Sequence, residues 1–181
     1  GFTLVSDSSN VTFPASNRIL NIGSGLSTTT TEESYERCYL YFKAPTQATG
    51  SSIGLALAST GAFVYKLYFY VDVNAATKYD VIVNGVNQST HSYDASGDTF
   101  LLVLDREDFT LYQNNAYVYS IENTNVFVPH KPRFDLANDG TEVQQITLNY
   151  FVSGKTGMTG PTGMTGCTGM QGIPGSAGES I

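Results

Sequence analysis

Residues 97–122 read GDTFLLVLDREDFTLYQNNAYVYSIE, and their apolar side chains alternate along the chain. Phe100, Leu102 and Leu104 would share one face of an extended segment, because successive side chains of a strand point to opposite faces. A short acidic run ends this segment, and Asn114–Asn115 separates the next two; asparagine tolerates the positive φ of tight hairpin turns. The stretch therefore predicts three consecutive antiparallel strands.

Similar short runs of β-branched and aromatic residues extend outward from this stretch, from residue 2 to residue 152. They are separated by Gly, Asn, Asp and Ser, and they show no helical period, so about eleven strands in a sandwich are expected. Tyr65, Leu67 and Phe69 would share one face of their strand. The segment LSTTTTEESYE, residues 26–36, is expected to be a loop rather than a strand.

The order of strands and turns in residues 97–122, with the closing segment FDLANDGTEVQQITLNYFV at 134–152, resembles the concanavalin A-like jelly rolls of lectins, glucanases and laminin G-like domains. The resemblance covers roughly residues 35–152. It implies an all-β, antiparallel jelly-roll β-sandwich, in which the last strand, formed by the closing segment, returns beside the first.

A second pattern begins at residue 154, where every third residue is glycine: Gly154, Gly157, Gly160, Gly163, Gly166, Gly169, Gly172, Gly175 and Gly178. This period is typical of the collagen triple helix, in which only glycine fits at the crowded axis. We therefore predict a head domain at 1–152, a collagen triple-helix stalk at 153–181 that could be the start of a longer repeat, and a homotrimer. An unstructured tail that keeps the period is the alternative.

The predicted stalk is poor in proline, with only Pro161 and Pro174, so three chains gain little stability from the repeat itself. The head is expected to hold them in register. Cys167 would form an interchain disulfide or remain a free thiol, whereas Cys38 is expected to be a buried apolar residue. Threonine fills the second slot of five triplets: Thr156, Thr159, Thr162, Thr165 and Thr168.

A sandwich head joined to Gly-X-Thr triplets is similar to the collagen-like surface proteins of large DNA viruses, phages and spore-forming bacteria. This resemblance implies an extracellular or virion-surface location, a structural and attachment role, and O-glycosylation of the five stalk threonines. The net charge of −7 and the pI near 4.6 argue against nucleic acid and anionic membranes as partners. No apolar stretch approaches the ~18 residues of a membrane span, so membrane insertion is not expected.

Catalytic signatures are absent from the sequence, and we expect no enzyme. His91 and His130 are interpreted as surface-loop residues, and no spacing of His or Cys predicts a metal site. Asp105, Glu107 and Asp108 are the nearest approach to a glycosidase carboxylate pair, but acidic residues are normal in a hairpin turn. A glycoside hydrolase is therefore the least favoured function.

Ligand-binding candidates come from two places. Tyr68 and Tyr70, beside Lys66 and Asp72, could contact a surface glycan or host receptor; alternatively, this face packs on the second sheet or on another copy. Asn138 and Asp139 offer oxygens suited to calcium, although turn chemistry explains them equally, so no cofactor is expected beyond this calcium option. A dedicated carbohydrate-binding lectin is the alternative to an attachment protein.

Overall fold

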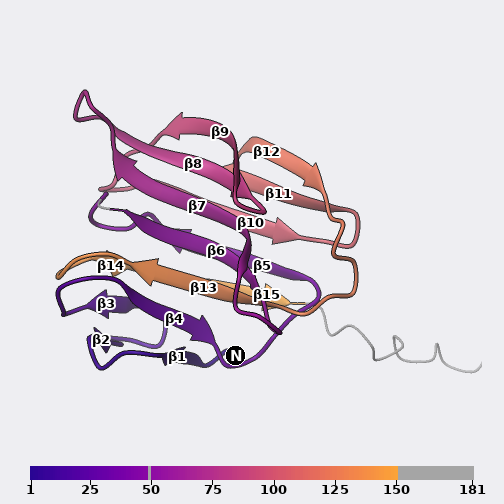
Figure 1. The fold of residues 1–181 in the computed structure, drawn as a ribbon, viewed down its shortest axis with the longest axis horizontal. Coiled ribbons are helices and arrows are strands. Elements are labelled where there is room, and N and C mark those ends of the chain that lie inside the picture. The colour runs from indigo at the N-terminus through magenta and orange to yellow at the C-terminus, as the bar shows by residue number, and fades with distance from the viewer. Residues whose placement is uncertain (49, 151–181) are drawn as a thin grey trace, which may run out of the picture.

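The computed structural model describes residues 1–48 and 50–150, and these form an all-β fold without helices (Figure 1). Two antiparallel sheets pack face to face, and a small third sheet lies at one side. The predicted β-sandwich is confirmed for the head. The predicted stalk at 153–181, with its glycines, its threonines and Cys167, lies outside the described residues.

The larger sheet has seven strands in the order β1-β4-β13-β6-β7-β8-β9. All of its neighbouring strands are antiparallel. Its strands are β1 (Leu4–Ser6), β4 (Ser27–Thr31), β13 (His130–Leu136), β6 (Ser51–Leu57), β7 (Phe63–Val71), β8 (Thr77–Val83) and β9 (Val86–Ser92).

The second sheet has five strands in the order β12-β11-β10-β5-β15. These strands are β12 (Ala116–Glu122), β11 (Asp108–Gln113), β10 (Thr99–Leu104), β5 (Cys38–Lys43) and β15 (Thr147–Tyr150). The small sheet has the order β14-β3-β2. Its strands are β14 (Glu142–Val143), β3 (Ile19–Asn21) and β2 (Val11–Thr12).

The core lies between the two large sheets and is rich in aromatic rings. Phe100 of β10 stacks on Phe42 of β5, with 5.6 Å between ring centroids, and meets Phe69 of β7 edge-on at 5.4 Å. Tyr65 of β7 stacks on Phe109 of β11 at 4.3 Å. Such pairs each add about 0.5–1.5 kcal/mol beyond burial, so the aromatic positions of the alternating pattern hold the sheets together.

The run of four threonines is a strand, so the expected loop at 26–36 is wrong over Ser27–Thr31. Thr29 and Thr31 are buried, whereas Thr28 and Thr30 point outward. Threonine is β-branched and suits a pleated surface, and β4 is paired on both edges, by β1 and by β13. Pairing with these distant strands makes Ser27–Thr31 a strand, and the local sequence of residues 26–36 gives no sign of that pairing.

The closing segment 134–152 forms three strands rather than one, and the last of them, β15, returns beside β5, the first strand of the region 35–152 that the resemblance covers. It supplies the end of β13, then β14, then β15, which belong to three different sheets. Asn138, Gly140 and Gln145 adopt positive φ between these strands, which turns the chain each time. β13 lies beside β4 and β6, and β15 lies beside β5.

Both histidines belong to strands, so their interpretation as surface-loop residues is wrong. His130 is fully buried in β13, and His91 is half-buried in β9. The predicted burial of Cys38 is confirmed, and burial raises the pKa of its thiol to about 12. The predicted hairpin turn is confirmed as well, since Asn114 and Asn115 have φ values of 50° and 64°.

Candidate functional site

The outward face of the seven-stranded sheet carries a row of polar side chains, which we call the polar row. The antiparallel register aligns one outward residue from each of six neighbouring strands. From β4 to β9 the polar row is Thr28, Asp135, Ser52, Tyr68, Asp80 and Thr90. Residues that are distant in sequence thus form one continuous surface.

Tyr68 and Tyr70 lie on this face, which points away from the five-stranded sheet. Leu67 and Phe69, which alternate with them along β7, point into the core instead. The two tyrosine rings stack with 5.5 Å between centroids and 21° between planes. Both rings are half-buried, so each keeps an accessible surface. The pair forms a flat aromatic platform on an otherwise polar face.

Asp80 fixes this platform in place. Its Oδ1 accepts a hydrogen bond from the Tyr70 hydroxyl at 3.0 Å and another from Thr90 Oγ1 at 2.7 Å. Burial, followed by the bond to Asp80 and its negative charge, raises the pKa of Tyr70. The Oδ2 atom of Asp80 accepts no hydrogen bond from the described residues, so it can receive one from a ligand.

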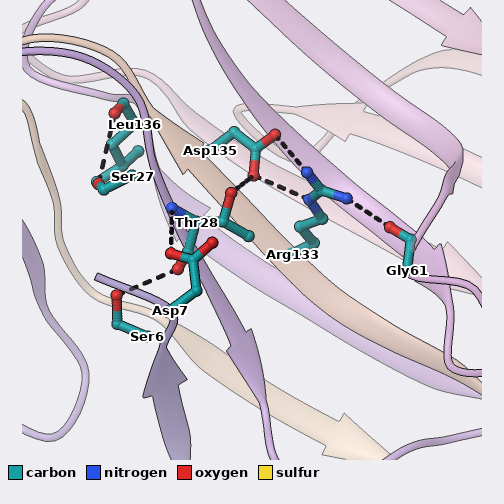
Figure 2. A network of polar contacts seen from close by, with 8 residues as sticks. All are labelled: Ser6, Asp7, Ser27, Thr28, Gly61, Arg133, Asp135 and Leu136. Carbon is teal, nitrogen blue, oxygen red and sulfur yellow. Dashed lines mark hydrogen bonds and ion pairs between the residues drawn. The ribbon is translucent and has the colours of Figure 1, made fainter.

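The other half of the polar row is closed by an ion pair, shown in Figure 2. Asp135 accepts bonds from Arg133 Nε at 2.9 Å and Arg133 Nη2 at 3.0 Å, which makes the pair bidentate. Thr28 Oγ1 donates to the same carboxylate at 2.9 Å, and Arg133 Nη1 donates to the carbonyl of Gly61. Both oxygens of Asp135 are therefore occupied, and this half of the row serves the structure.

The ring of Phe63 makes cation–π contacts with two basic side chains beside this ion pair. The guanidinium of Arg133 lies 4.7 Å from the Phe63 ring centroid, and Lys66 Nζ lies 5.5 Å from it. Cation–π contacts of this kind are worth about 0.5–1 kcal/mol at exposed sites. They tie β13 to the β6–β7 hairpin and leave the open half of the row at Tyr68, Asp80 and Thr90.

Small residues on the β6 side keep the tyrosine platform uncovered. Ser52 is the direct neighbour of Tyr68 on β6, and Gly50 comes just before that strand. A Cβ added to Gly50 would lie 3.5 Å from the Tyr68 hydroxyl, so the ring lies directly beside this glycine. Gly50 also has a φ of 94°, which disfavours any side chain there.

Asn138 and Asp139, the second pair of predicted ligand-binding residues, lie in the exposed β13–β14 turn. The carbonyl of Asp139 accepts a hydrogen bond from Gln47 Nε2 at 3.3 Å. Gln47 belongs to the β5–β6 connection, which reaches Tyr68 through Gly50. The structure thus brings all four predicted residues to one end of the sandwich, on either side of that connection.

Metal ligation finds little support in the part of the chain that the structure describes. No group of three or more His, Cys, Asp or Glu side chains gathers within residues 1–48 and 50–150. The carboxylates of Asp94 and Asp98 stabilise their own turn: Asp94 Oδ1 accepts bonds from Ser96 N and Oγ, and these lower the pKa of Asp94. Gln113 and Asn114 donate to Asp98.

Asp105 and Glu107 lie in the β10–β11 turn, as expected, and Asp108 is the first residue of β11. Asp105 Oδ1 accepts bonds from Arg37 Nε at 2.9 Å and from the backbone N–H of Arg106 at 2.7 Å. This turn follows the end of β10, whereas Phe100 at the start of that strand packs against Phe69 beside the tyrosines. A full strand length therefore separates these carboxylates from the platform.

Sequence reasoning found the tyrosines but missed Asp80 and Thr90. A signal was present, because residues 77–83 alternate in the same way as 63–71 and only a short turn joins them. Pairing these strands through the turn at Ala75, whose φ is 61°, would have placed Asp80 opposite Tyr68. The remaining contacts, from Ser52 and Asp135, depend on β6 and β13, whose pairing is not local.

Solved structures with the same arrangement of strands come from several kinds of domain. The exoplasmic/lumenal domain of VIP36, in its Ca2+/Man-bound form, gives a TM-score of 0.60 at 7% identity, covering 86% of this chain and 85% of that one. The SPRY domain of human HERC1 gives 0.58 at 15% identity, with 81% and 96% covered. The carbohydrate binding module CBM66 from Bacillus subtilis gives 0.56 at 14%, with 81% and 95% covered.

These likenesses define the class of the fold: the head is a concanavalin A-like jelly roll of the kind found in L-type lectin and SPRY domains. At such low identity they establish the fold alone. Neither the protein-family models nor the sequences of curated proteins gave a match to this chain. The described residues contain no helix long and apolar enough to cross a membrane.

Proposed function

We propose that this chain is a structural and attachment protein of a virion or cell surface. Its head, residues 1–152, contacts glycans with the platform of Tyr68 and Tyr70, and residues 153–181 form a collagen-like stalk that joins three copies. The observation that carries the glycan contact is the stacked tyrosine pair, held by Asp80 on an outward polar face.

Sugar chemistry matches this platform. A pyranose ring offers an apolar C–H face, which packs on a flat aromatic ring, and hydroxyl groups, which need donors and acceptors around it. The open Oδ2 atom of Asp80 is an acceptor, and Lys78 is a donor on the same face, where its Nζ bonds Ser92 Oγ at 2.8 Å.

Binding on such a shallow surface is weak for one head, and a trimer compensates for this. Linked sites raise the apparent affinity by about 10²–10⁴ when several engage together. The nine glycine triplets supply the link, since a collagen-like helix requires three chains. Surface display, a homotrimer and a glycan or host receptor as partner are therefore parts of one proposal.

The comparisons support the proposal by analogy of fold. VIP36 was solved with calcium and mannose, and Emp46p contributes a carbohydrate recognition domain that shares the arrangement at a TM-score of 0.58 and 12% identity. CBM66 is a carbohydrate binding module. A calcium ion could bind near the tyrosine platform as an accessory to the glycan site. Asn138 and Asp139 are the only ligands that we propose for it.

A glycan array tests the contact directly. The labelled chain 1–181 is expected to bind a subset of glycans at high surface density, and Tyr68→Ala or Tyr70→Ala should weaken binding at least tenfold. Phe13→Ala is the matched control, because Phe13 is also an exposed aromatic residue, 41% accessible, but follows β2 of the small sheet. Absence of binding to every glycan at high density would contradict the proposed contact.

A dedicated lectin is the second candidate, and the same tyrosine platform favours it. Calorimetric titration of a soluble oligosaccharide identified on the array distinguishes the two, because a soluble monovalent ligand reports the affinity of one site. A millimolar dissociation constant fits an attachment protein that depends on avidity, whereas a low micromolar constant identifies a lectin.

The proposal includes no catalysis. Two cavities lined by described residues lack a pair of lining carboxylates: one of about 200 Å³ lies beside Phe63 and Lys66, and one of about 450 Å³ lies beside Asp94. Hydrolysis of an array glycan that persists after Asp105, Glu107 and Asp108 are all replaced by alanine would exclude these carboxylates as its source. Hydrolysis of an array glycan by the wild-type chain would overturn the non-enzymatic role, whether or not it disappears with these carboxylates.

A further inference from the structure

The outward face of the five-stranded sheet is free of charge across its centre. Register aligns two rows of five outward residues, one from each strand, and we call them together the uncharged face. The first row is Thr147, Tyr41, Leu101, Tyr112 and Tyr117, and the second is Asn149, Tyr39, Val103, Thr110 and Ser120. Charged outward residues occur only at the strand ends, at Lys43, Asp108 and Glu122.

This absence of charge is specific to one side of the sandwich. The chain has 16 acidic and 9 basic residues, and the central rows of the seven-stranded sheet carry Asp80, Asp135, Lys66 and Arg133. Five strands at ~4.8 Å spacing and two rows at ~6.6 Å spacing give the uncharged face an extent of about 20 Å by 13 Å.

No described strand packs over the uncharged face, and its composition is that of an interface. Tyr117 is 64% accessible, and Thr147 and Asn149 are exposed. The rings of Tyr39, Tyr41 and Tyr112 are half-buried among their neighbours. Cores of protein–protein interfaces are enriched in tyrosine and depleted of charge, so this face is suited to an uncharged protein surface.

The position of the repeat identifies that partner. β15 is the edge strand of this sheet and ends at Tyr150. Gly154, the first glycine of the repeat, follows four residues later, and four residues span at most about 14 Å. The three chains of a collagen helix share one axis. Each of the three β15 ends must therefore lie within about 14 Å of the start of that axis.

We propose that the uncharged face is the contact between heads in the homotrimer, its occupants being the other two copies of this chain. This inference rests on the proposed trimeric stalk and names the surface that organises it. Thr147 and Asn149 are outward residues of β15 itself, so the face adjoins the strand that enters the repeat. Contact between these faces would align the three chain ends at the same level along the triple-helix axis. This alignment sets the register of the repeat, which its two prolines stabilise only weakly.

Sedimentation equilibrium and light scattering of the full chain test the interface. The wild-type chain is expected at three times its mass of 19.5 kDa. Leu101→Glu, which puts a charge in the centre of the face, should give folded monomers at the same concentration and a lower melting temperature of the triple-helix circular dichroism signal. Ile82→Glu is the matched control: Ile82 is also an outward, half-buried aliphatic residue, but it lies opposite Lys66 on the other sheet, so the trimer should persist.

Thr110→Lys is a second variant that keeps the test decisive if Leu101→Glu fails to fold. Thr110 is an outward, half-buried residue, so a lysine there can extend its charged end into solvent in a folded monomer. Trimers of unchanged mass and melting temperature in both variants would overturn the interface and leave the stalk intact. A monomeric or dimeric wild-type chain would overturn the trimer as well, whereas glycan binding is read separately on the array.

Discussion

Gly54 shows how closely β6 and β7 approach each other on the outward face. A Cβ added there would lie 1.9 Å from the carbonyl oxygen of Tyr65 and 2.6 Å from the Cα of Lys66. Both are backbone atoms, which cannot move aside as the end of a flexible side chain does. The two strands therefore need glycine at this position.

Replacement of Gly54 by alanine should destabilise the head by about 1–3 kcal/mol or more, the usual range for overpacking. Urea unfolding followed by tyrosine fluorescence measures the change. Gly97→Ala is the control, because nothing lies within 4 Å of a Cβ at Gly97 and its φ is not in the left-handed region; its effect should stay within about 0.5 kcal/mol. Equal stability of the Gly54 variant and the wild type would show that the strands can separate.

His130 couples the stability of the fold to pH. Its side chain is fully buried, its Nδ1 lies 2.7 Å from the carbonyl oxygen of Val128, and its Nε2 is buried without a hydrogen-bond partner among the described residues. Burial lowers the pKa of His130, and the bond to Val128 only partly opposes this. The folded protein therefore holds the neutral imidazole.

Because the folded pKa lies below the unfolded value near 6.5, the unfolded chain binds more protons as the pH falls through that value. We expect the urea midpoint to decrease from pH 7.5 to pH 5.5. His130→Phe should flatten this dependence. Burial lowers the pKa of His91 too, with the same sign, so His91→Asn is the comparison variant. A midpoint that rises on acidification would contradict the assignment.

At the scale of elements, the β11–β12 hairpin assigns different tasks to its two asparagines. Asn114 Oδ1 accepts a bond from Thr99 N at 2.9 Å, and its Nδ2 donates to Asp98 Oδ1 at 2.9 Å, so it ties the turn to β10. No side-chain bond of this kind is found for Asn115 in the described residues, and it contributes only its tolerance of a φ of 64°.

Asn115→Gly should therefore be neutral or stabilise the hairpin by a few tenths of a kcal/mol, and Asn115→Val should cost about 1–2 kcal/mol. Asn114→Gly should cost about 1–2 kcal/mol through its two lost hydrogen bonds. Thermal unfolding of the three variants under identical conditions gives this order. Equal losses for both glycine variants would show that Asn115 has a further role.

The hairpin was predictable and β4 was not, for a physical reason. Positive φ at Asn114–Asn115 and the alternation on both sides are properties of a continuous stretch of chain. Ser27–Thr31 has strand-forming residues but no apolar alternation, and its pairing with β13 joins residues about a hundred positions apart. The same limit applies to the candidate site, where Tyr68 and Tyr70 were predicted but Asp80 and Thr90 were not.

For the whole molecule, the central prediction concerns the repeat. Gly166→Ala places a methyl group at the axis of the proposed triple helix, where only glycine fits. The melting temperature of the triple-helix signal should fall, while urea unfolding of the head stays unchanged. Thr165→Ala, one position earlier and in an outward slot, should have a smaller effect. Identical melting in both variants would indicate a tail that keeps the period without winding.

The sequence by itself determined the strands with regular alternation, the tight turns and the glycine period that predicts three chains, because each depends only on residues next to one another. The tertiary structure alone decided which strands became neighbours. Burial of His130, the contact of Tyr70 with Asp80 and the uncharged face all follow from that pairing. Register joins distant segments through hydrogen bonds that any backbone can make, so their order is settled by the packing of the whole sandwich.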